Sequence, residues 1–145
     1  MADKGEKGEF PILIVDDESQ IVEALSNYLS EYEVDVAYDA NSALEKAATG
    51  EFKIILTDIA MPDLDGIELL KRVKDISPGI QVIMMTGQTT LTRASEAMKA
   101  GALKYLLKPF DDISEIDRAI EEAITKIKDW KDIFQKTILT KKRGD

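Results

Sequence analysis

Carboxylates, a threonine and a lysine follow the apolar runs of this chain. They are Asp16 and Asp17 after the first run, Asp58 after the third, Thr86 at the end of the fourth and Lys108 after the fifth. Carboxylates that gather in one place repel one another and raise each other's pKa unless a cation compensates. Oxygen ligands suit a hard divalent cation, so the sequence predicts Mg²⁺, with Mn²⁺ as the alternative.

The same residue types could carry out phosphoryl transfer. A carboxylate can attack phosphorus and form an acyl phosphate. Asp58 is best placed for this role, because it ends an apolar run and the turn AMPDLDG then leads into a helix. Lys108 would supply a mobile charge and Thr86 a hydroxyl to the transferred oxygens. Taken singly, Asp16 and Asp17 could also be a helix cap and its neighbour, Lys108 a surface lysine and Thr86 a strand-end threonine.

The absence of two residue types excludes other chemistry. The chain has no cysteine and no histidine. Disulfides, thiolate zinc sites, cysteine nucleophiles and serine-histidine relays are therefore excluded, and the chain has no phosphohistidine of its own.

Strand-sized apolar runs alternate with segments of helical spacing and would position these residues. The runs cover 10–15, 34–38, 52–57, 80–86 and 102–107. Such alternation predicts a doubly wound α/β sheet, whose ligands bind beyond the carboxyl ends of the strands. Ser42 with Glu45, and Asp112 with Glu115, have the spacing of helix starts, while Asp39 is better interpreted as a helix cap than as a site residue.

Charge and hydropathy limit the partners. Residues 1–125 carry 12 basic and 25 acidic side chains, against 7 and 3 in residues 126–145. An acidic body argues against binding of nucleic acid by this domain. No apolar run has the length of a membrane span, and the N-terminus does not resemble a signal peptide, so we expect a cytoplasmic protein with no membrane partner.

Four motifs occur in order at the expected strand ends: VDDE at 15–18, LTDIAMPDLDG at 56–66, MTG at 85–87 and KYLLKPF at 104–110. Together they resemble the receiver domains of two-component response regulators. The resemblance implies a flavodoxin-like fold with five parallel strands in the order 2-1-3-4-5. It places the receiver domain at 10–126, after a flexible segment at 1–9.

The resemblance also implies roles for site residues. Asp58 would take a phosphoryl group from a phosphohistidine of a sensor histidine kinase or phosphotransfer protein, and Lys108 would pair with that group. Asp17 and Asp58 would ligate Mg²⁺ directly, Asp16 mainly through water, and the backbone carbonyl of Ala60 would add another oxygen. The bond from Lys108 to Pro109 would be cis.

Thr86 and Tyr105 would form the family's switch pair. Phosphorylation would draw the Thr86 hydroxyl toward the phosphoryl group and turn Tyr105 inward, changing the surface of the fourth helix, fifth strand and fifth helix. Ala60 and Gln88 would occupy the positions that tune the phosphoryl lifetime. The domain would catalyse its own phosphorylation and dephosphorylation without a separate turnover substrate.

Apolar residues continue at helical spacing beyond the expected domain end, as far as Ile138. We expect a helical extension or linker at 127–145, with packing back on the same domain as the alternative. A homodimer could form through this extension or through the surface of the fourth helix, fifth strand and fifth helix.

Three other functions compete with the switch. An aspartyl-phosphate-forming phosphatase would use the same carboxylates, but usually has a second acid two residues after the nucleophile, where this chain has Ala60. A flavin or nucleotide carrier needs a phosphate-binding loop where this chain has DDES. A receiver-like docking module would never be phosphorylated.

Overall fold

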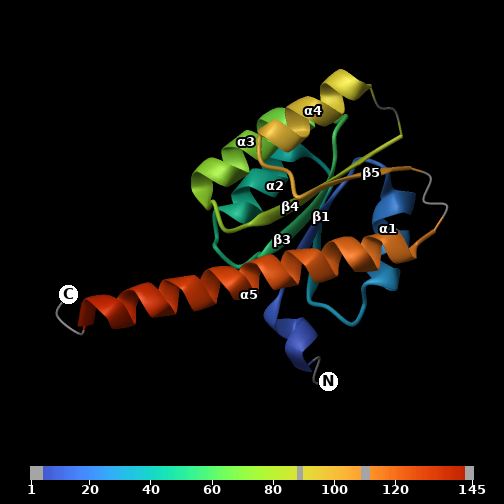
Figure 1. Cartoon of the computed structure of the whole chain (residues 1–145). Helices are drawn as coiled ribbons and strands as arrows, with labels where there is room; N and C mark the ends of the chain where they lie inside the picture. The colour runs from blue at the N-terminus through green and yellow to red at the C-terminus, as the bar shows by residue number, and fades with distance from the viewer. Residues whose placement is uncertain (1–4, 88–89, 109–111, 143–145) are drawn as a thin grey trace.

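The computed structural model describes residues 5–87, 90–108 and 112–142, with side chains as far as residue 139. Strands and helices alternate along these residues (Figure 1). The strands are β1 (Ile12–Val15), β2 (Val34–Ala37), β3 (Ile54–Asp58), β4 (Gln81–Thr86) and β5 (Lys104–Leu107). The helices are α1 (Ser19–Tyr28), α2 (Ala40–Ala47), α3 (Gly66–Ile76), α4 (Leu91–Lys99) and α5 (Ser114–Lys142), and a 3₁₀ helix, η1 (Gly5–Glu9), precedes β1.

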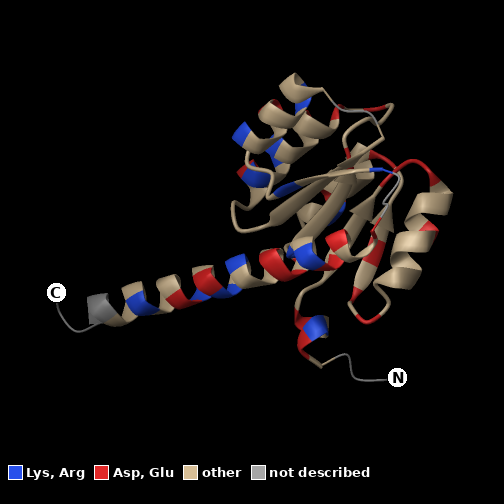
Figure 2. Ribbon diagram, turned by 45° about the vertical axis from the view of Figure 1, so that its right-hand side comes forward, with Lys and Arg blue, Asp and Glu red and all other residues tan. Residues whose placement is uncertain are grey.

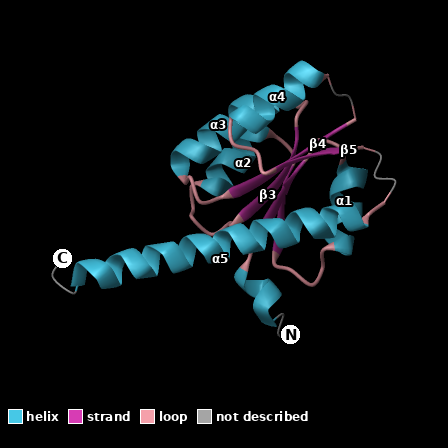
Figure 3. Ribbon diagram, viewed as in Figure 1, coloured by secondary structure: helices cyan, strands magenta, loops and turns pink. Residues whose placement is uncertain are grey.

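The strands form one parallel sheet in the order β2-β1-β3-β4-β5. Helices cover both of its faces (Figure 3). This arrangement confirms the predicted doubly wound fold and its strand order. In the pairing register Asp58 lies beside Met85, and Thr86 beside Leu107. The strand ends that carry the candidate site residues therefore lie together at the carboxyl ends of the parallel strands.

The core lies on both faces of the sheet because the central strands are apolar on both sides. All residues of β1, β3 and β4 are buried. On one face Leu13 and Val15 pack toward α2, α3 and α4, and on the other Ile12 and Ile14 pack toward α1 and α5. Burial on both faces explains why these strands appear in the sequence as continuous apolar runs.

The start of α2 corrects one local prediction. The helix begins at Ala40, and Oδ1 of Asp39 accepts a hydrogen bond from the backbone N–H of Ser42 at 2.7 Å. Ser42 is therefore inside the helix, and its prediction as a helix start is wrong. Asp39 is confirmed as the cap, because its carboxylate satisfies an amide that the first turn would leave without a partner.

The last helix extends well beyond the sheet. α5 has 29 residues, which corresponds to a length of about 43 Å. Its buried side chains are Ile116, Ala119, Ile120, Ala123 and Ile127. All side chains at 128–139 are exposed, and the helix projects away from the domain (Figure 1). In this structure Lys128 still pairs with Glu6 of η1, whereas the side chains of 129–139 do not pack back on the domain.

The described helices include none with the length and apolar character needed to cross a membrane. Along the projecting part of α5, acidic and basic residues alternate (Figure 2).

Candidate functional site

Three charged side chains meet where β1, β3 and β5 end. Nζ of Lys108 lies 3.5 Å from Oδ2 of Asp58 and donates a hydrogen bond to Oδ2 of Asp16. The side chains are 9% exposed for Lys108, 9% for Asp58 and 0% for Asp16. Residues separated by more than 40 positions thus form one compact charged group, as the strand order requires.

Burial determines the electrostatics of this group. Burial raises the pKa of Asp58, and the Lys108 ammonium and the backbone N–H of Ala60 oppose only part of this rise. Burial alone would lower the pKa of Lys108, but the hydrogen bond to Asp16 and the charges of Asp16 and Asp58 raise it overall. Lys108 therefore remains a positive charge at neutral pH, while Asp58 binds its proton more tightly than an ordinary aspartate.

Four acids offer ligand atoms within 4.8 Å of one another: Asp16, Asp17, Glu18 and Asp58. The loop that leads into α1 is strongly acidic (Figure 2). Lys108 can compensate only one of these charges, and carboxylate oxygens at this spacing fit a hard divalent cation that keeps part of its water shell. The residues present therefore fit Mg²⁺ or Mn²⁺.

Glu18 was not predicted as part of this acidic group. It is the N-cap residue of α1, and its side chain makes no capping hydrogen bond. The signal in the sequence was its place as the third acid of DDE. That signal is weak, because an acid at a helix start is also favoured by the helix dipole.

The site opens into a hollow of about 940 Å³. Asp17, Asp58, Ala60, Thr86 and Lys108 are among the residues that line it. Thr86 is 2% exposed, and its carbonyl accepts a hydrogen bond from the backbone N–H of Lys108 at 2.7 Å. The predicted acceptor, hydroxyl and lysine thus share one cavity.

Tyr105 lies half-buried on β5 and packs against the core cluster on the side of α2, α3 and α4. It is not among the described residues that line the hollow. Gln88, Pro109 and the predicted cis bond between Lys108 and Pro109 lie outside the described residues.

The turn after β3 holds Asp58 in place. The N–H of Ala60 donates to Oδ1 of Asp58 at 3.3 Å, and the N–H of Gly66 donates to the carbonyl of Ile59 at 2.8 Å. A Cβ atom on Gly66 would lie 2.6 Å from Cα of Ile59 and 2.7 Å from the carbonyl oxygen of Asp58. Only glycine allows α3 to begin so close to the end of β3.

A family model, the response regulator receiver domain, matches residues 12–121. The chain belongs to this family. Receiver domains are signalling domains of two-component systems, and the resemblance inferred from the strand-end motifs is confirmed.

Relatives and solved structures agree with this assignment. The transcriptional regulatory protein ZraR of Salmonella typhimurium is 36% identical over 121 residues, covering 81% of this chain and 27% of that protein. The DNA-binding transcriptional regulator NtrC of Azospirillum brasilense is 36% identical over 115 residues, covering 78% and 24%. The chain thus spans about a quarter of the length of these curated relatives.

Among solved structures, a CheY-like receiver domain from Methanospirillum hungatei superimposes with a TM-score of 0.76 at 32% identity, covering 83% of this chain and 98% of that one. The beryllofluoride-activated NtrC4 receiver domain dimer superimposes with a TM-score of 0.72 at 33% identity, covering 83% and 98%.

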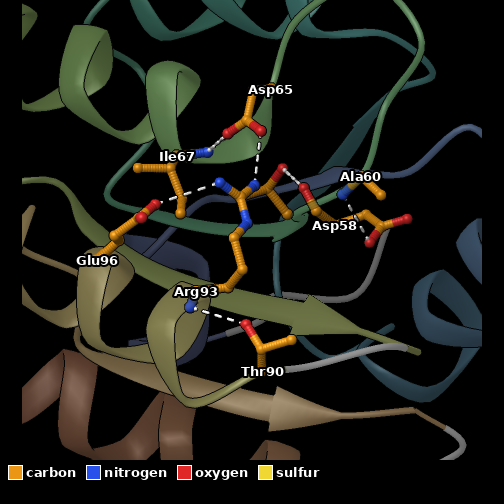
Figure 4. Close-up of polar contacts among 8 residues, drawn as sticks. Asp58, Ala60, Asp65, Ile67, Thr90, Arg93 and Glu96 are labelled. Atoms are coloured by element: carbon orange, nitrogen blue, oxygen red, sulfur yellow. Dashed lines mark hydrogen bonds and ion pairs between the residues drawn. The ribbon is translucent and has the colours of Figure 1, made fainter.

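Arg93 is a further residue of this receiver domain that sequence reasoning missed. Its side chain comes from the first turn of α4 and lines the same hollow as Asp58. Nη2 of Arg93 lies 2.6 Å from Oδ2 of Asp65, and Nη1 lies 3.3 Å from Oε2 of Glu96 (Figure 4). The pairing could not be found from sequence, because it depends on how α4 is placed beside the turn after β3.

Proposed function

We propose that this receiver domain is a phosphoacceptor switch in which Asp58 takes a phosphoryl group from a partner's phosphohistidine. The supporting observation is the approach of Lys108 Nζ to 3.5 Å from Oδ2 of Asp58, inside an acid-lined hollow. The partner would be a sensor histidine kinase or a phosphotransfer protein in the cytoplasm. These 145 residues contain no histidine, so the phosphohistidine must lie outside them.

The transfer exchanges one bond to phosphorus for another. A carboxylate oxygen of Asp58 forms the O–P bond while the P–N bond of the phosphohistidine breaks, and the electron pair leaves with the imidazole nitrogen, which takes up a proton. Lys108 stabilises the negative charge on the phosphoryl oxygens, and the Thr86 hydroxyl donates a hydrogen bond to one of them. Hydrolysis breaks the O–P bond again: water attacks phosphorus, and the Asp58 carboxylate leaves.

Asp17 and Asp58, the Ala60 carbonyl and, through water, Asp16 would hold Mg²⁺, or Mn²⁺ in its place. When bound, the ion would neutralise charge on the transferred group. Glu18 is close enough to Asp58 to contribute a further oxygen. Within the chain itself, Asp58 supplies the nucleophile and Lys108 supplies the fixed positive charge.

Phosphorylation would change the surface formed by α4, β5 and α5 through Thr86 and Tyr105. Thr86 lies in the hollow, and its backbone is hydrogen-bonded to the residue that follows β5. Tyr105 is half-buried on that strand, so a rotation of its ring would alter the exposed surface. Phosphorylation would shift the population toward whichever state binds the phosphoryl group more tightly. The altered surface would control a downstream partner or an output domain.

Intact mass measurement tests the proposal. We expect the chain to gain one phosphoryl group from acetyl phosphate in the presence of Mg²⁺, and Asp58→Asn to gain none. Asp63→Asn is the matched control, because Asp63 lies in the same turn but its carboxylate accepts hydrogen bonds from the backbone of Ala40 and Asn41. Equal labelling of all three proteins, or none in any, would show that Asp58 is not the acceptor, and steady turnover of phosphate esters would favour a phosphatase.

We also propose that the projecting part of α5 pairs with a second copy of the chain. Trp130, Ile133, Phe134 and Ile138 expose 40–66% of their surface there. A helix without tertiary contacts is marginal in water, so a stripe of this kind needs a partner. The similarity to a receiver domain solved as a dimer supports a second copy as that partner.

A further inference from the structure

An ion pair joins α4 to the turn that carries the acceptor. Oδ2 of Asp65 pairs with Nη2 of Arg93 at 2.6 Å, while Oδ1 accepts a hydrogen bond from the backbone N–H of Ile67 at 2.8 Å (Figure 4). One carboxylate therefore caps α3 and also holds the first turn of α4. We call the ion pair between Arg93 and Asp65 the α4 latch.

The two helices joined by the latch differ in how firmly they are attached to the domain. α3 buries Gly66, Ile67, Leu69, Leu70 and Val73. α4 buries Ala97 alone among its nine residues, and Leu91 in its first turn is 88% exposed. Few apolar contacts hold the first turn of α4, so an ion pair can contribute a large share of its attachment.

The latch lies beside the phosphorylation site. Arg93 and Thr90 line the hollow together with Asp58. Thr90 caps α4, because its Oγ1 accepts a hydrogen bond from the backbone N–H of Arg93 at 3.1 Å. The Asp58 carboxylate turns toward the amide of Ala60, away from the Arg93 guanidinium (Figure 4). Arg93 is thus engaged with Asp65 and does not duplicate the contact of Lys108 with the acceptor.

Glu96 is the second carboxylate on Arg93, but it does not connect elements. It lies three residues later on α4, with Oε2 at 3.3 Å from Nη1 of Arg93. A substitution at Glu96 therefore removes a charge contact of Arg93 without removing the connection between α4 and the turn. The chain offers in this way a matched control for the latch.

We propose that the α4 latch holds α4 in its unphosphorylated position and opposes phosphorylation of Asp58. This inference rests on the proposed function. A phosphoryl group brings close to two negative charges into the hollow beside the latch, and the ion pair between Arg93 and Asp65 must open before the first turn of α4 can move. The first turn of α4 then moves away from the turn after β3. Because linkage is reciprocal, weakening the latch must raise the affinity of the site for a phosphoryl group. Arg93 is a positioning residue that acts through α4.

Two measurements test the latch on the intact chain. Hydrogen exchange of the α4 amides, without phosphodonor, reports the opening of the helix, and titration with beryllofluoride and Mg²⁺ reports affinity for a phosphoryl mimic. We expect Arg93→Gln and Asp65→Asn each to speed exchange and to lower the beryllofluoride midpoint by about two- to fivefold, the range of a partly exposed ion pair. Asparagine keeps the α3 cap. The double variant should change no more than either single variant, and Glu96→Gln should change neither quantity.

Specific results would overturn the latch. A higher beryllofluoride midpoint in Arg93→Gln would mean that Arg93 binds the phosphoryl group. Additive effects in the double variant, or unchanged exchange of the α4 amides, would show that the ion pair does not hold the helix. If the wild type neither binds beryllofluoride nor accepts phosphate, the proposed function fails, and the exchange measurement still decides whether the latch exists.

Discussion

Substitution of Lys108 by methionine should destabilise the fold far more than loss of an ordinary surface charge. The change removes the ammonium that faces Asp16 and Asp58 and leaves two nearly buried carboxylates without it. Removing one partner of a buried ion pair costs about 3–5 kcal/mol, and because the hollow admits water we expect the lower end, about 3 kcal/mol at pH 7. Methionine keeps most of the apolar stem, so packing should change little.

The pH dependence identifies the cause. The pKa of Asp58 is already raised in the folded chain, so its contribution to stability is present at low pH and is lost as pH rises through the folded pKa. The Lys108 ammonium limits how far the pKa of Asp58 is raised, so removing it should raise that pKa further. The difference between Lys108→Met and wild type should therefore be full at pH 7 and shrink as the carboxyls become protonated at lower pH.

Urea unfolding followed by circular dichroism measures this difference. Lys104→Met is the matched control, because Lys104 lies on β5, is 42% exposed and pairs with Glu122 at 3.1 Å. An exposed pair of this kind contributes about 0.2–1 kcal/mol. Addition of Mg²⁺ should recover part of the loss in Lys108→Met and none in Lys104→Met. Equal small losses in both variants, or a difference that does not change with pH, would refute the reasoning.

Three further predictions concern other parts of the domain. Gly66→Ala should lower the free energy of unfolding by roughly 2 kcal/mol or more, because its Cβ would overlap the backbone of Asp58 and Ile59. Gly79→Ala is the control: the space around its Cβ is open, so its free energy of unfolding in the same urea titration should stay within about 1 kcal/mol of the wild type. In the absence of Mg²⁺ the Asp58 carboxyl should take up its proton on acidification at a higher pH than an ordinary aspartate, because burial raises its pKa, and NMR titration of this carboxyl measures the effect; a carboxyl that stays fully ionised at pH 4 would contradict this. Phe134→Glu should shift the molar mass measured by light scattering toward that of the monomer. Gln135→Glu, on a different side of α5, should leave the molar mass unchanged. Identical masses for both variants would argue against pairing through the exposed apolar residues of α5.

The fold could be predicted because its central strands are buried on both faces. Continuous apolar runs such as the one ending at Val15 can be recognised without knowing their neighbours, and the strand-end rule then places Asp16, Asp58, Thr86 and Lys108 in one region. The ends of elements do not follow from apolar runs alone. Phe10 belongs to an apolar run and is buried, yet it lies before β1, because burial and strand pairing are separate requirements.

The parts of the site that sequence reasoning missed depend on placement of helices and turns. Asp65 was part of a recognised motif, but its pairing with Arg93 requires that α4 cross beside the turn after β3. Glu18 joins the acidic group because the chain turns sharply between β1 and α1. Such contacts depend on orientation in space, which residue type and spacing do not specify. The roles of the site residues remain predictions carried by family resemblance: Asp16, Asp17, Asp58, Ala60, Thr86, Tyr105 and Lys108.

The position of β5 at the margin of the sheet has a mechanical consequence. β3 is buried along its whole length between β1 and β4, whereas β5 has a sheet neighbour on one side and none of its residues is fully buried. Asp58, the proposed acceptor, therefore lies on a strand held on both sides, whereas Lys108 follows a strand held on one side only. If phosphorylation acts on both residues, as proposed, β5 can shift more readily than β3. The structural change would then reach the surface at the edge of the sheet that β5 forms.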